Sequence, residues 1–266
     1  MTVTFSSPYV EVTQQGRIAV LTLNRPEKRN AVCDALIEDV NKFVLSLHEG
    51  AKKREVDAVV LRGAGGHFCA GLDLAEHKDR PPFEGVKHSM FWHDTLERLE
   101  FGPVPVVAAL HGGVIGGGLE IATAAHVRVA DETAFFQLPE GRRGIYVGGG
   151  ASVRVQKIIG FDRMREMMLT GRKYDAAEGE RLGLAHYVVK KGQAFERALE
   201  LAHDIAGNAE MSNFMMIHAL PRIADLERNG GFFMESLAAA MSQTSEDAKK
   251  GIEAFLKKQA IRFDKK

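Results

Sequence analysis

Cysteine is scarce in this sequence, and long apolar runs are missing. Cys33 and Cys69 are the only cysteines in 266 residues, too few for a disulfide framework and without metal-ligand spacing. No uninterrupted apolar run approaches the roughly 20 residues that span a bilayer. The first twenty residues also lack the basic start and apolar core of a signal peptide. We therefore expect a cytoplasmic protein in a reducing compartment.

Net charge is also absent, because 35 basic residues cancel 35 acidic ones. No global field is left to hold nucleic acid or an anionic membrane, so neither is expected as a partner. Apolar residues make up 45% of the chain and charged residues 26%, the balance of an ordinary globular protein. The length favours one large domain with a smaller appendage.

Short apolar runs separated by glycine turns and helical patterns predict an α/β architecture with largely parallel strands. The expected strands are Val10–Thr13, Ile18–Leu23, Ala58–Leu61, Val104–Leu110, Val127–Ala130 and His186–Val189. A helix is expected from Asp34, with Asp34 as its N-cap. Strand, glycine turn and helix are predicted to follow one another twice, after the runs at 58–61 and 104–110.

The last third of the chain has apolar residues at helical spacing and no strand pattern after about Gln193. The glycine pair Gly230–Gly231 is expected to break this helical region. A helical segment of this size cannot bury a large core alone, so it should pack on its own domain or on another subunit. We predict a core at 1–200 and a helical oligomerisation region at 201–266.

Two glycine-rich segments follow predicted strands, but neither matches a nucleotide-binding motif. Gly112–Gly118 is followed by no Lys-Ser or Lys-Thr and contains no Gly-x-Gly-x-x-Gly. Such a turn at the start of a helix exposes backbone N–H groups to an anion. The small-residue turn Cys69–Asp73 could present a second donor, and two convergent N–H groups form an oxyanion hole.

Two other site types are disfavoured. His67, Cys69, His77, His88 and His93 match no zinc pattern, so we expect packing or surface roles and no metal. The stretch Gly150–Val153 lacks the closing glycine of a nucleophile elbow, which disfavours a serine hydrolase. Trp92 is interpreted as part of an acyl pocket or of the core.

The segments Cys69–Asp73 and Gly116–Glu120 resemble the two signature segments of the crotonase, or enoyl-coenzyme A hydratase, superfamily. Leu138–Glu140 resembles a third, and Leu23–Ala31 is also similar, so the resemblance spans nearly the whole chain. It implies a ββα spiral core with a C-terminal trimerisation region, in trimers or hexamers. The implied reaction adds water across the double bond of an enoyl-CoA thioester, which makes the chain a hydro-lyase.

The resemblance also implies roles for particular residues. The backbone amides of Leu72 and Gly117 would hold the thioester oxygen, because attack of water at the β carbon places negative charge there. Glu140 would be the main proton carrier, and Glu120 would position and activate the water. The carbonyl of Ala70 would read the adenine amino group, and Ala31 is a further candidate for CoA binding.

The phosphates of coenzyme A need cations, and Lys28 or Arg29, with Lys258, are the candidates. Coenzyme A is part of the substrate, so no cofactor is expected.

The segment Gly141–Gly150 departs from many enoyl-CoA hydratases and is similar to the methylthioacryloyl-CoA hydratases of dimethylsulfoniopropionate breakdown. The narrower hypothesis is therefore hydration of methylthioacryloyl-CoA with methanethiol release and thioester hydrolysis. A general short-chain enoyl-CoA hydratase and a noncatalytic, RNA-associated member of the fold are the alternatives.

Overall fold

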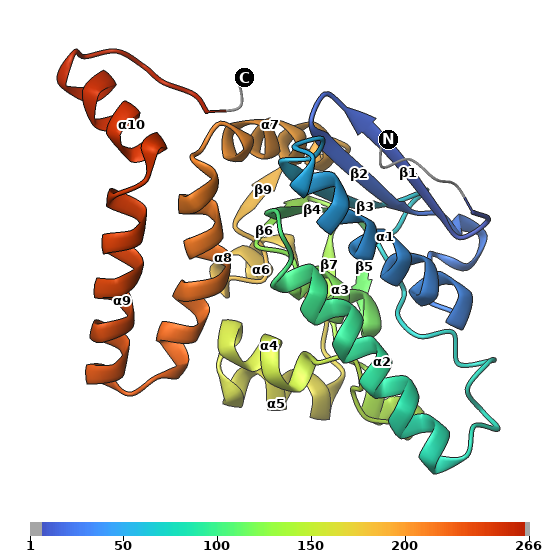
Figure 1. The fold of residues 1–266 in the computed structure, drawn as a ribbon. Helices are drawn as coiled ribbons and strands as arrows, with labels where there is room; N and C mark the ends of the chain where they lie inside the picture. The colour runs from blue at the N-terminus through green and yellow to red at the C-terminus, as the bar shows by residue number, and fades with distance from the viewer. Residues whose placement is uncertain (1–6, 264–266) are drawn as a thin grey trace.

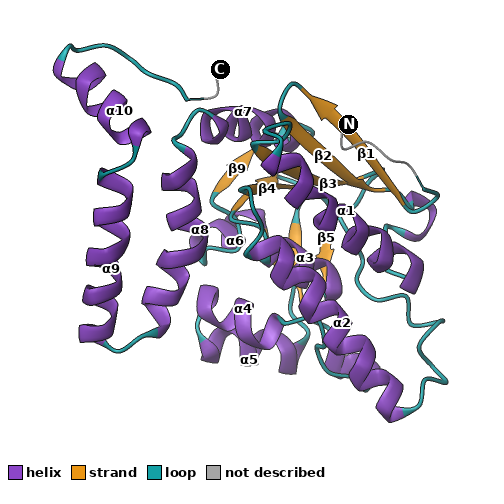
Figure 2. Ribbon diagram, viewed as in Figure 1, coloured by secondary structure: helices purple, strands orange, loops and turns teal. Residues whose placement is uncertain are grey.

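The computed structural model describes residues 7–263, built around a six-stranded sheet with helices on both faces (Figures 1 and 2). The strand order is β1-β2-β3-β4-β6-β9. These strands are β1 (Val10–Gln15), β2 (Ile18–Leu23), β3 (Ala58–Gly63), β4 (Val106–Leu110), β6 (Val127–Asp131) and β9 (Tyr187–Val189). All six expected strands are therefore present, with ends shifted by two residues at most.

Within the six-stranded sheet only the first pair of strands is antiparallel, and it closes through a turn in which Gly16 has φ 60°. From β2 to β9 every pairing is parallel. Strands β3 and β4 are nearly continuous apolar runs, as expected for parallel strands that are covered on both faces. The predicted α/β class with largely parallel pairing is confirmed.

A second, three-stranded sheet has the order β5-β7-β8. It consists of β5 (Gly113–Ile115), β7 (Phe135–Gln137) and β8 (Tyr174–Asp175). The predicted helix after the glycine cluster is present as α3 (Gly117–Thr123), but the sequence did not predict β5, which lies between β4 and that helix. Strand β5 pairs in parallel with β7 and through Val114 with Cys69, a pairing between distant segments that local periodicity does not reveal.

Two buried apolar clusters lie on the two faces of the large sheet. Helix α7 (Ala194–Ala206) covers one face and contacts β2, β3, β4, β6 and β9. Its small residues Ala194, Ala198, Ala202 and Ala206 are all buried there. On the other face, α1 (Asp34–Lys52) contacts β1 and α2 (Pro82–Glu100).

The smaller helices surround the second sheet and the loops between strands. They are η1 (Pro26–Lys28), α3 (Gly117–Thr123), η2 (Glu140–Arg143), α4 (Ala151–Ile159), α5 (Phe161–Thr170) and α6 (Ala176–Arg181). Helix α1 begins at Asp34, and its N-cap is Cys33 in extended conformation, without a side-chain cap. The N-cap prediction was therefore wrong by one residue; Asp34 instead accepts two hydrogen bonds from Arg80.

The C-terminal helices are α8 (Glu210–Asp225), α9 (Arg228–Gln243) and α10 (Glu246–Leu256). Figure 1 shows α9 outside α8, on the side away from the sheet. Gly230 and Gly231 lie inside α9, so they do not break the helical region; the break is at Leu226–Glu227, where the Glu227 side chain caps the new helix. The domain boundary at 200/201 falls within α7 and stays a prediction.

Within residues 7–263, none of the helices combines the length and the hydrophobicity that a membrane crossing requires.

A buried asparagine joins the loop after β2 to the loop after β3. The Asn30 side chain is fully buried and donates to the carbonyl oxygens of Ala64, His67 and Phe68 at 2.8–3.1 Å. It also accepts from the Arg25 N–H at 2.8 Å. Because these carbonyls precede Cys69, Asn30 fixes where the following turn begins.

We predict that Asn30→Gly lowers the free energy of unfolding by about 2–4 kcal/mol, since several buried hydrogen bonds of roughly 1 kcal/mol each are lost. Glycine tolerates the left-handed φ of 57° at this position, so backbone strain does not contribute. Denaturant titration at fixed protein concentration measures the change. The matched control is Arg29→Gly, exposed and at φ 54°, with an expected change within ~0.5 kcal/mol. Equal effects of the two substitutions would contradict the anchoring role of Asn30.

Candidate active site

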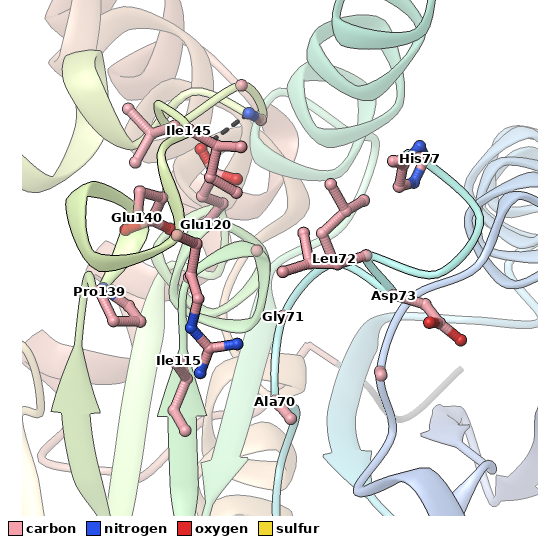
Figure 3. A pocket seen from close by; sticks show the side chains of 18 of the residues that line it. Ala70, Gly71, Leu72, Asp73, His77, Ile115, Glu120, Pro139, Glu140 and Ile145 are labelled. Atoms are coloured by element: carbon pink, nitrogen blue, oxygen red, sulfur yellow. Dashed lines mark hydrogen bonds between the residues drawn. The ribbon is translucent and has the colours of Figure 1, made fainter. Parts of the chain in front are cut away.

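A cavity of about 850 Å³ opens between the turn after β3, the start of α3, helix α2 and the segment that follows β7. In Figure 3, Glu120 and Glu140 lie on one side of it and the segment Ala70–Asp73 lies on the other. Glu120, Glu140, Leu72 and Gly117, which are far apart in sequence, all line this cavity. The structure thus brings together the four residues that the sequence singled out for chemistry, although their roles stay predictions.

Glu120 lies in α3 and is nearly fully buried, with 4% of its surface exposed. Its Oε1 accepts hydrogen bonds from the backbone N–H groups of Gly149 at 2.7 Å and Ala151 at 3.0 Å. Burial raises the pKa of the carboxyl, and the two N–H donors oppose that rise. One oxygen of Glu120 is therefore held in a fixed place by the chain.

Glu140 is the first residue of η2 and is buried to a similar degree, yet its surroundings differ. Within residues 7–263, its Oε2 is buried and has no hydrogen-bond partner. Burial and, to a smaller extent, the nearby charge of Glu120 raise the pKa of Glu140 to about 7, against the lowering effect of its own backbone N–H. A carboxyl with this pKa exists in both protonation states near neutral pH, as proton transfer in both directions requires.

The glycines of this region leave the room that the carboxyls occupy. A Cβ at Gly116, where φ is 52°, would lie 2.8 Å from Glu140 Oε1. A Cβ at Gly149 would lie 2.7 Å from Glu120 Oε2. Side chains at either position would displace the carboxyl groups.

Two backbone N–H groups lie beside each other in the wall of the same cavity. A Cβ at Gly117 would be 3.4 Å from the nitrogen of Leu72, and one at Gly71 would be 3.1 Å from the nitrogen of Gly117. In the described part of the chain neither N–H donates to another backbone group. The Gly117 N–H also lies at the start of α3, where the helix dipole favours negative charge. The pair is suited to bind an oxyanion.

The residues proposed for coenzyme A are divided by the structure. Arg29, Ala31 and Ala70 line the cavity, whereas Lys28 and Lys258 are not among its lining residues. The Lys28 Nζ pairs with Asp73 at 3.2 Å. The assignments of Lys28 and Lys258 stay predictions.

Sequence reasoning missed several residues that line the cavity. The missed cations are Arg80, Arg142, Arg143 and Lys173, and the missed histidines in its wall are His77 and His88. Arg142 and Arg143 were quoted only as a departure from the family pattern. Arg80, His77, His88 and Lys173 belong to no recognisable sequence motif. They reach the cavity only because α2 and the turns before α2 and β8 fold against it.

His77 and His88 lie near Asp34. One ring nitrogen of each histidine and one carboxylate oxygen of Asp34 all lie within 4.8 Å of one another. Such a group could hold a metal ion. However, Arg80 donates to both oxygens of Asp34, at 2.9 and 2.7 Å. Ion pairing therefore accounts for this cluster.

Comparison with known proteins identifies the class. The family model described as enoyl-CoA hydratase/isomerase matches residues 13–266. Enoyl-CoA hydratase EchA19 of Mycobacterium tuberculosis is 32% identical over 261 residues, covering 97% of each chain. The short-chain-enoyl-CoA hydratase of Clostridium acetobutylicum is 31% identical, covering 95% of this chain and 96% of its own.

Solved structures agree. A Rhodopseudomonas palustris protein has a TM-score of 0.90 at 45% identity, covering 96% of this chain and 97% of its own. The enoyl-CoA hydratase of Bacillus anthracis has a TM-score of 0.89 at 28% identity, over 97% of this chain and all of its own. The chain therefore belongs to the enoyl-CoA hydratase/isomerase family, and the predicted crotonase-like fold is confirmed.

We predict that Glu140→Gln stabilises the protein at pH 8 by up to about 3 kcal/mol, from a pKa of about 7 against 4.5 in the unfolded chain. The pKa is raised on folding, so ionised Glu140 destabilises the fold above pH 7. This penalty shrinks as pH falls and vanishes below 4.5, where both states are protonated. Unfolding titrations at pH 8 and pH 4.5 measure the difference. Exposed Glu97→Gln on α2 is the control; equal behaviour of the two variants would contradict the raised pKa.

Proposed function

We propose that this protein is an acyl-CoA hydratase that adds water across the α,β double bond of an enoyl-CoA thioester. The observation that carries the proposal is that two buried carboxyls and two adjacent backbone N–H groups line one cavity, and that within residues 7–263 neither N–H donates to another backbone group. Hydration of a conjugated thioester needs both at once, because it moves protons and develops negative charge on a carbonyl oxygen.

The geometry supports the following sequence of events. The thioester oxygen accepts hydrogen bonds from the N–H groups of Leu72 and Gly117, which stabilise the enolate. Glu120, held by Gly149 and Ala151, orients the water with its other oxygen. As the water oxygen bonds to the β carbon and the carbon–carbon double bond becomes a single bond, Glu140 takes a proton from the water and delivers it to the α carbon. The carboxyl with a pKa of about 7 suits this exchange, and the fixed carboxyl suits positioning.

Coenzyme A itself is the proposed ligand of the outer part of the cavity. Five cations line the cavity, namely Arg29, Arg80, Arg142, Arg143 and Lys173, and of these Arg80 is paired with Asp34. The lining acid Asp73 is already paired with Arg25 at 2.7 Å and with Lys28. The excess of positive charge suits a phosphate-bearing substrate.

A noncatalytic binding role is the alternative from another class. It gives no reason for two carboxyls to be buried beside each other at a cost in stability, one of them without a partner in the described chain. The neutral net charge also disfavours an RNA partner.

Methylthioacryloyl-CoA is the narrower substrate that we propose. The support is the sequence of Gly141–Gly150, whose residues Arg142, Arg143, Ile145 and Tyr146 line the cavity beside Glu140. Water would add to the carbon that bears sulfur, and the resulting hemithioacetal would expel methanethiol. The same two carboxyls would then assist hydrolysis of the thioester.

We predict that crotonyl-CoA and methylthioacryloyl-CoA both lose their enoyl-thioester absorbance with the wild-type protein. Glu140→Ala and Glu120→Gln should each lower kcat by roughly a hundredfold to ten-thousandfold, the usual contribution of acid–base catalysis. Free thiol, followed in parallel, should rise with methylthioacryloyl-CoA.

Exposed Glu97→Gln is the control and should keep wild-type kcat. No turnover by the wild type would contradict the hydratase proposal. Turnover of crotonyl-CoA far faster than methylthioacryloyl-CoA would leave a general short-chain enoyl-CoA hydratase.

We also propose that copies of this chain associate through the C-terminal helices into a trimer, or into two stacked trimers. Helix α9 exposes Phe232, Phe233, Leu237 and Met241, each by more than half. Helix α10 exposes Ile252, Phe255 and Leu256 in the same way. Apolar area of this extent on a monomer indicates an interaction surface, and a second copy is its simplest occupant.

We predict a mass of three or six chains by size-exclusion chromatography with light scattering. Phe233→Asp with Leu237→Asp should lower the mass, because charges are placed in an apolar contact. Exposed Glu235→Gln on the same helix should not. A monomeric wild type would contradict the proposed assembly.

A further inference from the structure

Trp92, the only tryptophan of the chain, lies in α2 and is 97% buried in the wall of the cavity. Its ring is packed against two glycines of the site. A Cβ at Gly117 would lie 3.0 Å from Trp92 Cη2, and a Cβ at Gly149 would lie 2.7 Å from Trp92 Cε3. Gly117 carries a proposed oxyanion donor, and the Gly149 N–H holds Glu120. One ring therefore touches both halves of the catalytic arrangement.

The indole is in turn fixed by a chain of polar contacts. Trp92 Nε1–H donates to His88 Nε2 at 3.1 Å, and the same His88 nitrogen is 3.1 Å from Asp34 Oδ1. Asp34 is held by Arg80 through both of its oxygens. The His77 ring lies 4.6 Å from the His88 ring. Because His88 Nε2 carries either a lone pair or a proton, it accepts from the indole in the first case and donates to Asp34 in the second.

We infer that Trp92 is a positioning residue, which holds the Gly117 donor and the Gly149–Glu120 contact in register, and that His88 holds Trp92. The inference rests on the proposed hydratase function. Because protein interiors are close-packed, an indole ring against the backbone of Gly117 and Gly149 keeps both segments from shifting. A misplacement of 1 Å in such a site can lower the rate about a hundredfold.

The hydrogen bond from Trp92 requires a neutral His88. An indole N–H can only donate, so His88 Nε2 must have a free lone pair to accept it. Once protonated there, Nε2 donates to Asp34 instead and the indole loses its partner. Burial lowers the pKa of His88, and Arg80 and His77 lower it further, while Asp34 opposes them. His88 is therefore neutral at pH 7.5 and takes up its proton below its ordinary pKa of 6.5.

Three variants separate positioning from general packing. Trp92→Phe removes the N–H and part of the ring. His88→Leu removes the acceptor. His88→Gln keeps an acceptor for the indole and a donor for Asp34, without titrating. Exposed His48→Gln on α1 is the control. Circular dichroism and thermal unfolding establish that each variant folds.

At pH 7.5, with crotonyl-CoA, we expect kcat to fall on the order of tenfold to a hundredfold in Trp92→Phe and His88→Leu. KM should change less than about threefold, because ground-state binding is largely kept. His88→Gln should restore kcat to within about threefold of the wild type. The single tryptophan gives a direct readout, so wild-type emission should change as pH falls from 7.5 to 5, and His88→Gln should abolish that change.

Unchanged kcat in Trp92→Phe would overturn the positioning role of Trp92. Equal losses in His88→Leu and His88→Gln, or the same pH-dependent emission in His88→Gln and the wild type, would overturn the role of His88. An inactive wild type would instead overturn the proposed function, and this inference with it.

Discussion

The close approach of two backbone segments is the constraint on which the rest of this site depends. The turn after β3 and the segment from β5 into α3 lie so near each other that a Cβ at Gly118 would be 2.4 Å from the Cys69 carbonyl oxygen. A Cβ at Gly71 would be 2.7 Å from the Ile115 carbonyl oxygen. Only glycine permits this contact, and it places the N–H groups of Leu72 and Gly117 side by side. The parallel bridge between Cys69 and Val114 keeps the two segments in register.

The two buried carboxyls of the site differ in how their oxygens are hydrogen-bonded. Glu120 receives two backbone N–H groups, whereas an oxygen of Glu140 has no partner within the described chain. Because each hydrogen bond favours the charged form and burial opposes it, the same residue type is suited to different roles. The carboxyl that we propose as the proton carrier is the one whose burial is least compensated, so the site carries a free energy penalty that the large cores on both faces of the sheet must offset.

The supporting contacts come from distant parts of the fold. Asn30 holds the turn after β3 through hydrogen bonds to the carbonyl oxygens of Ala64, His67 and Phe68. Arg154 donates to the Gly149 carbonyl at 3.1 Å and pairs with Glu100 at the end of α2. The donors to Glu120 are thus tied to the same helix that carries Trp92 and His88. These contacts link the positions of donors and carboxyls, which explains why residues without catalytic chemistry line the site.

The six strands of the large sheet, the α/β class and the glycine turns could be predicted from the sequence, because alternation, apolar runs and glycine preference are local properties of the chain. The sequence also singled out Glu120 and Glu140, through their place in segments that resemble a family. It could not reveal β5 pairing with Cys69, the gathering of Asp34, His77 and His88, or the contact of Trp92 with Gly117 and Gly149. Only the tertiary structure decided these, since they join residues far apart in the chain, and neither spacing nor periodicity carries information about which distant segments meet.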